Sequence, residues 1–195
     1  SIGLFSLDKD QNATLAETLQ IGAYSYANPV LSDDGEVMFY LSDREDNDPE
    51  SALDIRNTRV AVSTKSNGQF QQGERFDSND EVSTGYGDSN VKVAGSDGSY
   101  AAVWVRQTED ITENVVPGTA LDDGQQMLQI NSTEIMAATS TGGSDWTLEQ
   151  LTDNSTPDLA PVVAASGNRI IVAWREVKSS DASNLTNFDQ QDAIR

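Results

Sequence analysis

The chain has 195 residues, of which 32 are Asp or Glu and 12 are Lys or Arg, so its formal net charge is −20; it has no cysteine and no histidine. A surface this acidic repels polyanions, which excludes nucleic acid as a partner and disfavours anionic membranes. The lack of cysteine excludes disulfides and thiolate metal sites, and no apolar run reaches the ~18 residues that a membrane helix needs. The acidity is compatible with cation binding, calcium above all, and equally with the solubility of a secreted protein.

The first two predicted elements are hairpins of different kinds. The stretch GLFSLDKDQNATLAETL, from Gly3, consists of a strand, a polar turn and a second strand. The stretch NPVLSDDGEVMFYLSDR, from Asn28, has an apolar strand, a tight Asp-Gly turn and a second apolar strand. Turn dipeptides between apolar runs are a good short-range signal for a hairpin.

Both hairpin types recur further along the chain. RVAVSTKSNGQFQQGERF from Arg59 and EIMAATSTGGSDWTLEQLT from Glu134 repeat the first type, and NVKVAGSDGSYAAVWVRQ from Asn90 and APVVAASGNRIIVAWREV from Ala160 repeat the second. In the second type the turn glycines are Gly35, Gly98 and Gly167, and the second strands end on Tyr40, Trp104 and Trp174. Two hairpins make a unit of four strands that recurs at roughly 55 to 75 residues, because the joining loops vary in length.

This periodicity predicts an all-β fold, a β-propeller-like tandem of four-stranded antiparallel blades. The chain amounts to about three blade-equivalents and starts and ends mid-blade. We expect the outer hairpin of a split blade at 1–27, blades at 28–89 and 90–159, and the inner hairpin of a split blade at 160–195. Unpaired edges at both ends predict further propeller blades as partners, from the same chain or another, for example two chains that close one ring. The recurrent aromatic rings should be buried between blades; they are Tyr40, Phe70, Trp104, Trp146 and Trp174.

The stretch TSTGGSDW resembles the Asp-box of sialidase-type (BNR-repeat) β-propellers, whose pattern is Ser/Thr-x-Asp-x-Gly-x-Thr-Trp. Thr139, Gly143 and Trp146 match that pattern. The first copy keeps Ser6 and Asp8, and the middle copy keeps Gly68 and an aromatic, Phe70. The resemblance implies a structural turn between the outer two strands of a blade, on the face away from the ligand. It therefore supports a fold and by itself implies no activity.

On the face where ligands of that family bind, the resemblance implies four candidate residues. They are Tyr40, Arg44, Arg106 and Arg175, at or just after the ends of the second strands. Family members that are sialidases use an arginine cluster, a tyrosine paired with a glutamate and an acidic proton donor. No tyrosine with an adjacent glutamate can be singled out in this sequence, so we assign no catalytic residue. The arginines are equally explained by ion pairs with neighbouring acids, which include Asp43, Glu45, Asp110 and Glu176.

Calcium is the one candidate cofactor. Asp8, Asp10 and Asn12 place side-chain oxygens at alternating positions of a tight loop, as calcium loops do. The EF-hand pattern is incomplete, because Ala13 stands where that loop needs glycine, and a solvated turn explains the same residues. Three long loops, 42–58, 106–133 and 176–195, should leave one face of the propeller and carry many acidic residues, as binding loops on rigid scaffolds do.

Two functions follow as hypotheses. The first is a non-catalytic binding or scaffold module of a bacterial secreted or cell-surface protein, whose acidic loop face meets a glycan, a protein or calcium. The second is a fragment of a sialidase-like glycoside hydrolase that needs further blades for activity.

Overall fold

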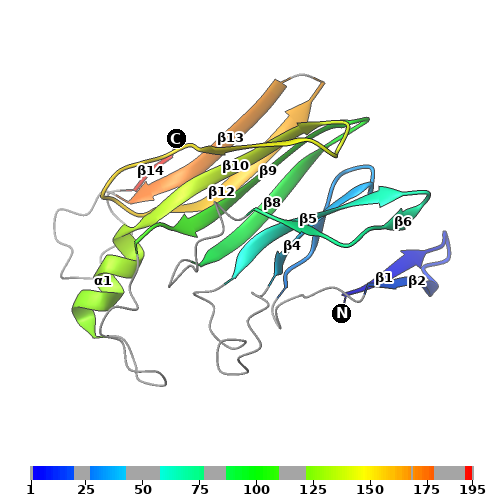
Figure 1. The fold of residues 1–195 in the computed structure, drawn as a ribbon, viewed down its shortest axis with the longest axis horizontal. Coiled ribbons are helices and arrows are strands. Elements are labelled where there is room, and N and C mark those ends of the chain that lie inside the picture. The colour runs from blue at the N-terminus through cyan, green and yellow to red at the C-terminus, as the bar shows by residue number, and fades with distance from the viewer. Residues whose placement is uncertain are drawn as a thin grey trace.

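The structure, a computed structural model, describes residues 2–19, 27–42, 58–76, 87–109, 122–167, 169–177 and 192–194. Throughout these ranges the strands pair only antiparallel, and one short helix accompanies them (Figure 1). The predicted all-β antiparallel class is therefore confirmed. None of the helices in the described part of the chain is both long and apolar enough to cross a membrane.

Most of the strands belong to three stacked sheets. The first sheet contains β3 (Val30–Leu31), β4 (Val37–Ser42), β5 (Arg59–Ser66), β6 (Gln69–Phe70) and β7 (Glu74–Arg75). The second contains β8 (Asp88–Ser96), β9 (Ser99–Gln107), β10 (Thr133–Thr141) and β11 (Trp146–Gln150), in that spatial order. The third contains β12 (Asp158–Ser166), β13 (Arg169–Val177) and β14 (Asp192–Ile194). A separate hairpin, β1 (Ile2–Leu7) with β2 (Ala13–Leu19), precedes them.

The second sheet is a complete four-stranded meander, and its turns follow from local sequence. Asp97 and Gly98 join β8 to β9 with φ values of 54° and 81°, and Asn67 and Gly68 join β5 to β6 with φ values of 53° and 80°. Two consecutive left-handed residues match the right-handed twist of the flanking strands, which is why Asp-Gly and Asn-Gly are favoured in two-residue hairpins.

The main core lies between the first two sheets, which pack face to face. Phe39 and Val60 of the first sheet and Trp104 of the second are all fully buried there. Phe76 stacks on Phe39 and on Trp104, with centroid distances of 6.1 Å and 5.6 Å, and the edge of Trp146 meets Phe39 at 5.0 Å. Aromatic pairs at such separations add to the stabilisation that area burial alone gives.

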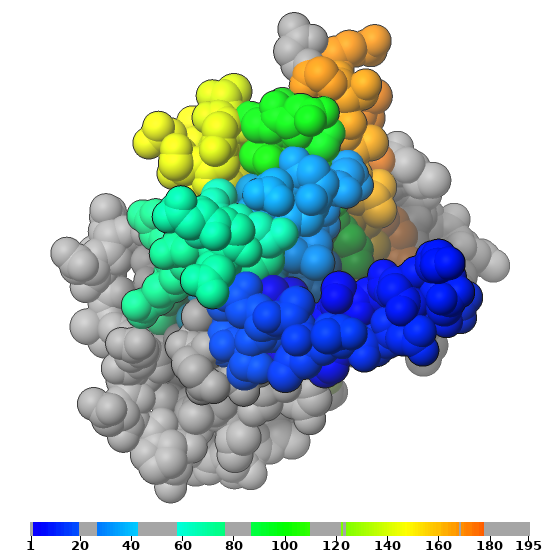
Figure 2. Space-filling view, turned by 90° about the vertical axis from the view of Figure 1, so that its right-hand side faces the viewer, coloured from blue at the N-terminus to red at the C-terminus, as the bar shows by residue number. Residues whose placement is uncertain are grey.

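The opposite face of the first sheet is covered by the β1–β2 hairpin. Ile2 and Leu19 of the hairpin pack with Met38, Tyr40 and Phe70 of the sheet in a second apolar cluster. Figure 2 shows the hairpin in blue against the light-blue and cyan-green residues of the first sheet. The first sheet is thus buried on both faces, whereas the hairpin and the third sheet are the outer layers of the stack.

Hydrogen bonds tie the short turns of successive sheets together. The β3–β4 turn and β8 exchange two bonds, from the Asp33 backbone N–H to the Gly95 carbonyl and from the Gly95 N–H to the Asp33 carboxylate, each 3.0 Å long. Thr64 Oγ1 donates to the Gly143 carbonyl at 2.6 Å, and Ser99 Oγ to the Gly167 carbonyl at 3.0 Å. All three sheets are connected in this way at their turn ends.

The repeat is also visible in the backbone. Asn28, Asn90 and Ala160, which head the three aligned segments of the sequence, have φ values of 43°, 55° and 51°. In β8 and β12 this residue falls within a break in the strand register, between Ser89 and Lys92 and between Leu159 and Val162. A left-handed residue inside a strand disrupts the pairing ladder and bends the strand, so β8 and β12 enter their sheets through the same irregularity.

Two predictions about local structure need qualification. Of the recurrent aromatics, Tyr40, Phe70 and Trp104 are buried as expected, but Trp146 and Trp174 are only half-buried. The sequence also indicated no helix, whereas α1 (Asp123–Asn131) lies in the connection from β9 to β10. A capping box starts it: the Asp122 carboxylate accepts from the Gln125 backbone N–H at 2.8 Å, and the Gln125 side chain accepts from the Asp122 N–H at 2.9 Å.

Candidate functional site

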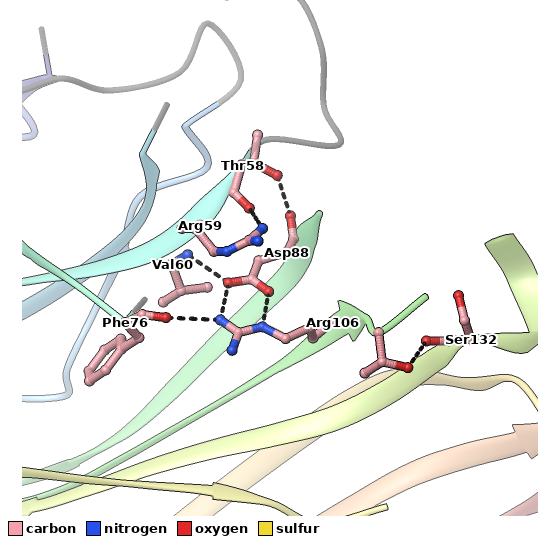
Figure 3. Close-up of polar contacts among 8 residues, drawn as sticks. Thr58, Arg59, Val60, Phe76, Asp88, Arg106 and Ser132 are labelled. Carbon is pink, nitrogen blue, oxygen red and sulfur yellow. Dashed lines mark hydrogen bonds and ion pairs between the residues drawn. The ribbon is translucent and has the colours of Figure 1, made fainter. Parts of the chain in front are cut away.

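Among the described residues, the buried charged side chains lie at the strand ends opposite the short turns. Asp88 opens β8 and lies directly across from Arg106 at the end of β9. Arg106 donates from Nε to Asp88 Oδ1 at 2.7 Å and from Nη2 to Oδ2 at 2.8 Å, a bidentate pair. The Asp88 side chain has no exposed surface and that of Arg106 is only 10% exposed. This is a buried ion pair, drawn in Figure 3.

The same pair joins the second sheet to the first. The Val60 backbone N–H donates to Asp88 Oδ2 at 2.9 Å, and Arg106 Nη2 donates to the Phe76 carbonyl at 3.1 Å. Thr58 Oγ1 donates to the Asp88 carbonyl at 2.9 Å (Figure 3). Every oxygen of Asp88 is therefore bonded, as buried carboxylates require.

A second acidic group is buried where the second sheet meets the third. Asp158, at the start of β12, is 0% exposed, and Glu134, in β10, is 2% exposed. Asn154 bridges them: its backbone N–H donates to Glu134 Oε1 at 2.9 Å and its side-chain Nδ2 donates to Asp158 Oδ2 at 2.8 Å. The remaining oxygens, Glu134 Oε2 and Asp158 Oδ1, are buried without a hydrogen-bond partner.

The pKa of Glu134 reflects these surroundings. Burial raises its pKa above the usual value, and the carboxylates of Asp158 and Asp153 act in the same direction. Hydrogen bonds from Thr152 and from the Asn154 backbone oppose the rise and are outweighed. Glu134 is thus a carboxyl group whose charge is poorly compensated by the protein.

Of the four residues expected on the ligand face, two are interior. Arg106 is held by Asp88, an acid that the sequence-based ion-pair alternative did not name. Tyr40 is buried with its hydroxyl against Gly73, and burial raises its pKa. Arg175 is half-buried in β13, and Arg44 lies outside the described residues. Among the described residues, Tyr40 and Arg106 therefore do not lie on an open surface.

The loop suggested for calcium is a hydrogen-bonded turn. Asp8 Oδ1 accepts from the backbone N–H groups of Asp10 and Asn12, at 2.8 Å and 2.9 Å, and Oδ2 accepts from the Asn12 side chain at 2.9 Å. These bonds, those from Asn12 first, lower the pKa of Asp8. They account for the acidic residue at this position as a turn former. In the part of the chain that the structure describes, no three acidic side chains are arranged as a metal cluster.

The residues that resemble an Asp-box lie in turns or packing positions. Gly143 is buried in the β10–β11 turn, where its N–H donates to Ser140 Oγ at 3.1 Å, and Trp146 begins β11. Thr139 is half-buried in β10, while Ser6 and Asp8 are exposed around the β1–β2 turn. Gly68 and Phe70 belong to the β5–β6 hairpin, where Phe70 packs under β1 and β2. Of these residues, Gly143 and Gly68 lie in turns and Phe70 and Trp146 pack against the core.

Exposed apolar side chains lie on both outer layers of the stack. On the hairpin they are Phe5, Leu7 and Leu15, with Phe5 63% exposed and directly paired with Leu15. On the third sheet, Val162 and Ile171 are exposed, Ile171 by 61%, and the strand register places them on one face.

Comparison with models of protein families, with curated proteins and with solved structures found no match.

The sequence-based reasoning missed the buried acids, although a signal was present. Asp88 and Asp158 each precede the left-handed residue of their repeat, Asn90 or Ala160, by two positions. The aligned segments begin at that residue, so the shared aspartate lies just outside them. Glu134 was the first residue of its aligned segment, but nothing local distinguished it from the many exposed acids.

Proposed function

We propose that this chain is a non-catalytic binding or scaffold module, part of a β-propeller-like assembly in a secreted or cell-surface bacterial protein. The observation that carries the proposal is a stack of antiparallel sheets whose two outer layers expose apolar faces. Contiguous apolar surface on an outer layer marks a site of association. Further four-stranded units are the occupants that continue such a stack.

The strand edges support the same proposal. Among the described residues, β13 pairs with β12 along its length but with β14 only at Arg175–Val177, and β1 pairs with β2 alone. The pairing of Asp192–Ile194 with Arg175–Val177 matches that of Thr133–Ile135 with Val105–Gln107 in the complete second sheet. An extension of β14 and a fourth strand beside it would complete the third sheet by β-strand addition, in the way that β10 and β11 complete the second sheet.

The ligand would be a glycan, a protein or calcium, met by the acidic face of the assembly. A net charge of −20 favours cationic partners over anionic ones. The glycoside hydrolase alternative gains no support from the described residues, because Arg106 is committed to Asp88 in the interior.

Sedimentation and native mass measurement of the purified chain test the assembly. We expect the 195-residue chain to associate through its outer faces, and the variant Phe5→Ser/Leu15→Ser to be monomeric. The matched control is Leu128→Ser, because Leu128 is also an exposed apolar residue but belongs to α1 and not to an outer layer. A wild-type chain that stays a stable 21.0 kDa monomer at high concentration would contradict the proposal.

A further inference from the structure

Each sheet in the stack has two faces of different kinds. In the second sheet, Tyr100, Ala102 and Trp104 point toward the first sheet and belong to the main core. Ala101 and Val103 alternate with them along β9 and are fully buried on the opposite face, where β12 packs. We call the face toward the preceding layer the earlier face and the face toward the following layer the later face.

The third sheet exposes its later face. In strand register, Ile171 of β13 corresponds to the buried Ala101 of β9. Ile171 is nevertheless 61% exposed, and Val162, on the same face of β12, is 54% exposed. The apolar residues of this surface, here called the sheet face, are Val162, Ala164, Ile171 and Ala173.

The β1–β2 hairpin exposes its earlier face. Ile2 and Leu19 pack against the first sheet, which is the following layer. Phe5 and Leu15 pair across the hairpin and lie on the other side, where both approach within 4 Å of the position that a Cβ of Gly3 would take. Phe5 is 63% exposed and Leu15 is 53% exposed. These two side chains are here called the hairpin face.

We propose that the hairpin face of one copy of this chain packs on the sheet face of a second copy, so that copies associate head to tail. The inference rests on the proposed function and names the partner and the polarity of its assembly. The two faces lie at opposite ends of the stack (Figure 1), and a contact between them is heterologous because it joins different surfaces of the two copies.

The internal junctions support this polarity. Among the described layers, each junction joins the later face of one layer to the earlier face of the next, and the two exposed faces are one of each kind. A contact between two hairpin faces, or between two sheet faces, would join like faces, which no junction of the described layers does. A head-to-tail contact instead continues the existing stack.

The relief of the two faces also differs. On the sheet face, each branched side chain has an alanine as its cross-strand partner, because Ala164 pairs with Ile171 and Ala173 pairs with Val162. On the hairpin face, Phe5 projects as a large ring. A ring that packs over an alanine and against the branched side chain beside it removes apolar surface of both copies from water.

Complementation between two variants tests the contact. Phe5→Ser/Leu15→Ser alters the hairpin face and keeps the sheet face, whereas Val162→Ser/Ile171→Ser does the reverse. Each variant alone should associate roughly tenfold or more weakly than the wild type, because one half of every contact is altered. In an equimolar mixture each variant supplies the face that the other lacks, so a 1:1 complex and no larger species should form. Native mass measurement identifies this complex because the two variants differ in mass.

The matched control is Leu128→Ser, which alters an exposed apolar side chain of α1 and should associate as the wild type does. Circular dichroism checks that the variants are folded. If a double variant is not, the single substitutions Phe5→Lys and Ile171→Lys, both at exposed positions, provide the same complementary pair.

The head-to-tail contact is overturned if either variant alone associates as strongly as the wild type, because like faces then suffice. It is also overturned if the mixture stays monomeric while the wild type associates, or if Leu128→Ser abolishes association. In these cases the proposed function stands and only its polarity fails. A wild type that is monomeric at high concentration contradicts both.

Discussion

Removal of one partner of the Asp88–Arg106 pair should be far more costly than removal of both. In the variant Arg106→Met, Asp88 keeps only the hydrogen bond from the Val60 N–H, because its two other side-chain bonds come from the guanidinium. The Asp88 side chain has no exposed surface, so water cannot replace the lost donors. Breaking a buried pair in this way costs about 3–5 kcal/mol, a large part of the ~5–15 kcal/mol by which a domain is stable.

The double variant Asp88→Asn/Arg106→Met removes both charges, while the carbonyl oxygen of the substituted amide can still accept from the Val60 N–H. Because no uncompensated charge is buried, we expect this double variant to lose less stability than Arg106→Met alone. Equilibrium unfolding in urea, followed by tryptophan fluorescence, gives the free energies of unfolding of the wild type, the two single variants and the double variant. A loss below about 1 kcal/mol in Arg106→Met, as for an exposed pair, or strictly additive effects of the two substitutions, would refute this account of the site.

Three further predictions concern the turns and the core. The substitution Gly143→Ala should destabilise the fold by about 1–2 kcal/mol because of its left-handed backbone alone. In urea unfolding it should cost more than Gly142→Ala, because an added Cβ at Gly143 meets Thr64 and two other side chains within 3.4 Å, whereas one at Gly142 meets nothing. Asp34 has a lowered pKa, because hydrogen bonds, those from Ser32 and the Glu36 backbone first, outweigh the raising effect of burial. The ionised Asp34 carboxylate therefore stabilises the fold above its unfolded-state pKa, and this contribution is lost as the pH falls through the lower folded-state pKa. The Asp34→Asn variant should show a weaker acid dependence of unfolding in that window. Truncation of the half-buried Trp146 to Ala should cost roughly 1.5–3 kcal/mol, less than the ~3–5 kcal/mol of a fully buried ring, and a thermal melt that matches wild type would contradict its packing against Phe39.

The hairpins could be predicted from the sequence because their information is local. Asp97-Gly98 and Asn67-Gly68 require left-handed backbone at two successive residues, and the flanking alternation of apolar side chains fixes the strands. The recurrence of these signals then predicted units of four strands, which the second sheet contains. The short helix α1 was missed although its Asp-x-x-Gln cap is also local, because its residues form no sustained apolar stripe.

The buried charges could not be predicted in the same way because their partners are distant in sequence. Asp88 meets Val60 and Arg106 only after two sheets have packed together, and the burial that makes the pair costly to break is a property of that packing. Glu134 and Asp158 resemble the many solvated acids of this chain until the fold removes water from them. The composition indicated an affinity for cations but not where on the chain they would bind. The candidate loop around Asp8 is a hydrogen-bonded turn.

The hydrogen bonds between neighbouring turns make the layers mechanically dependent on one another. The Asp33–Gly95, Thr64–Gly143 and Ser99–Gly167 bonds all run between sheets, so a layer that detaches leaves broken bonds on the surface it uncovers. The amide hydrogens of Asp33 and Gly95, which both take part in bonds between two sheets, should consequently exchange with solvent together. In a structure made of nearest-neighbour layers, resistance to unfolding then rises with the number of layers joined, and each added unit would protect those already in place.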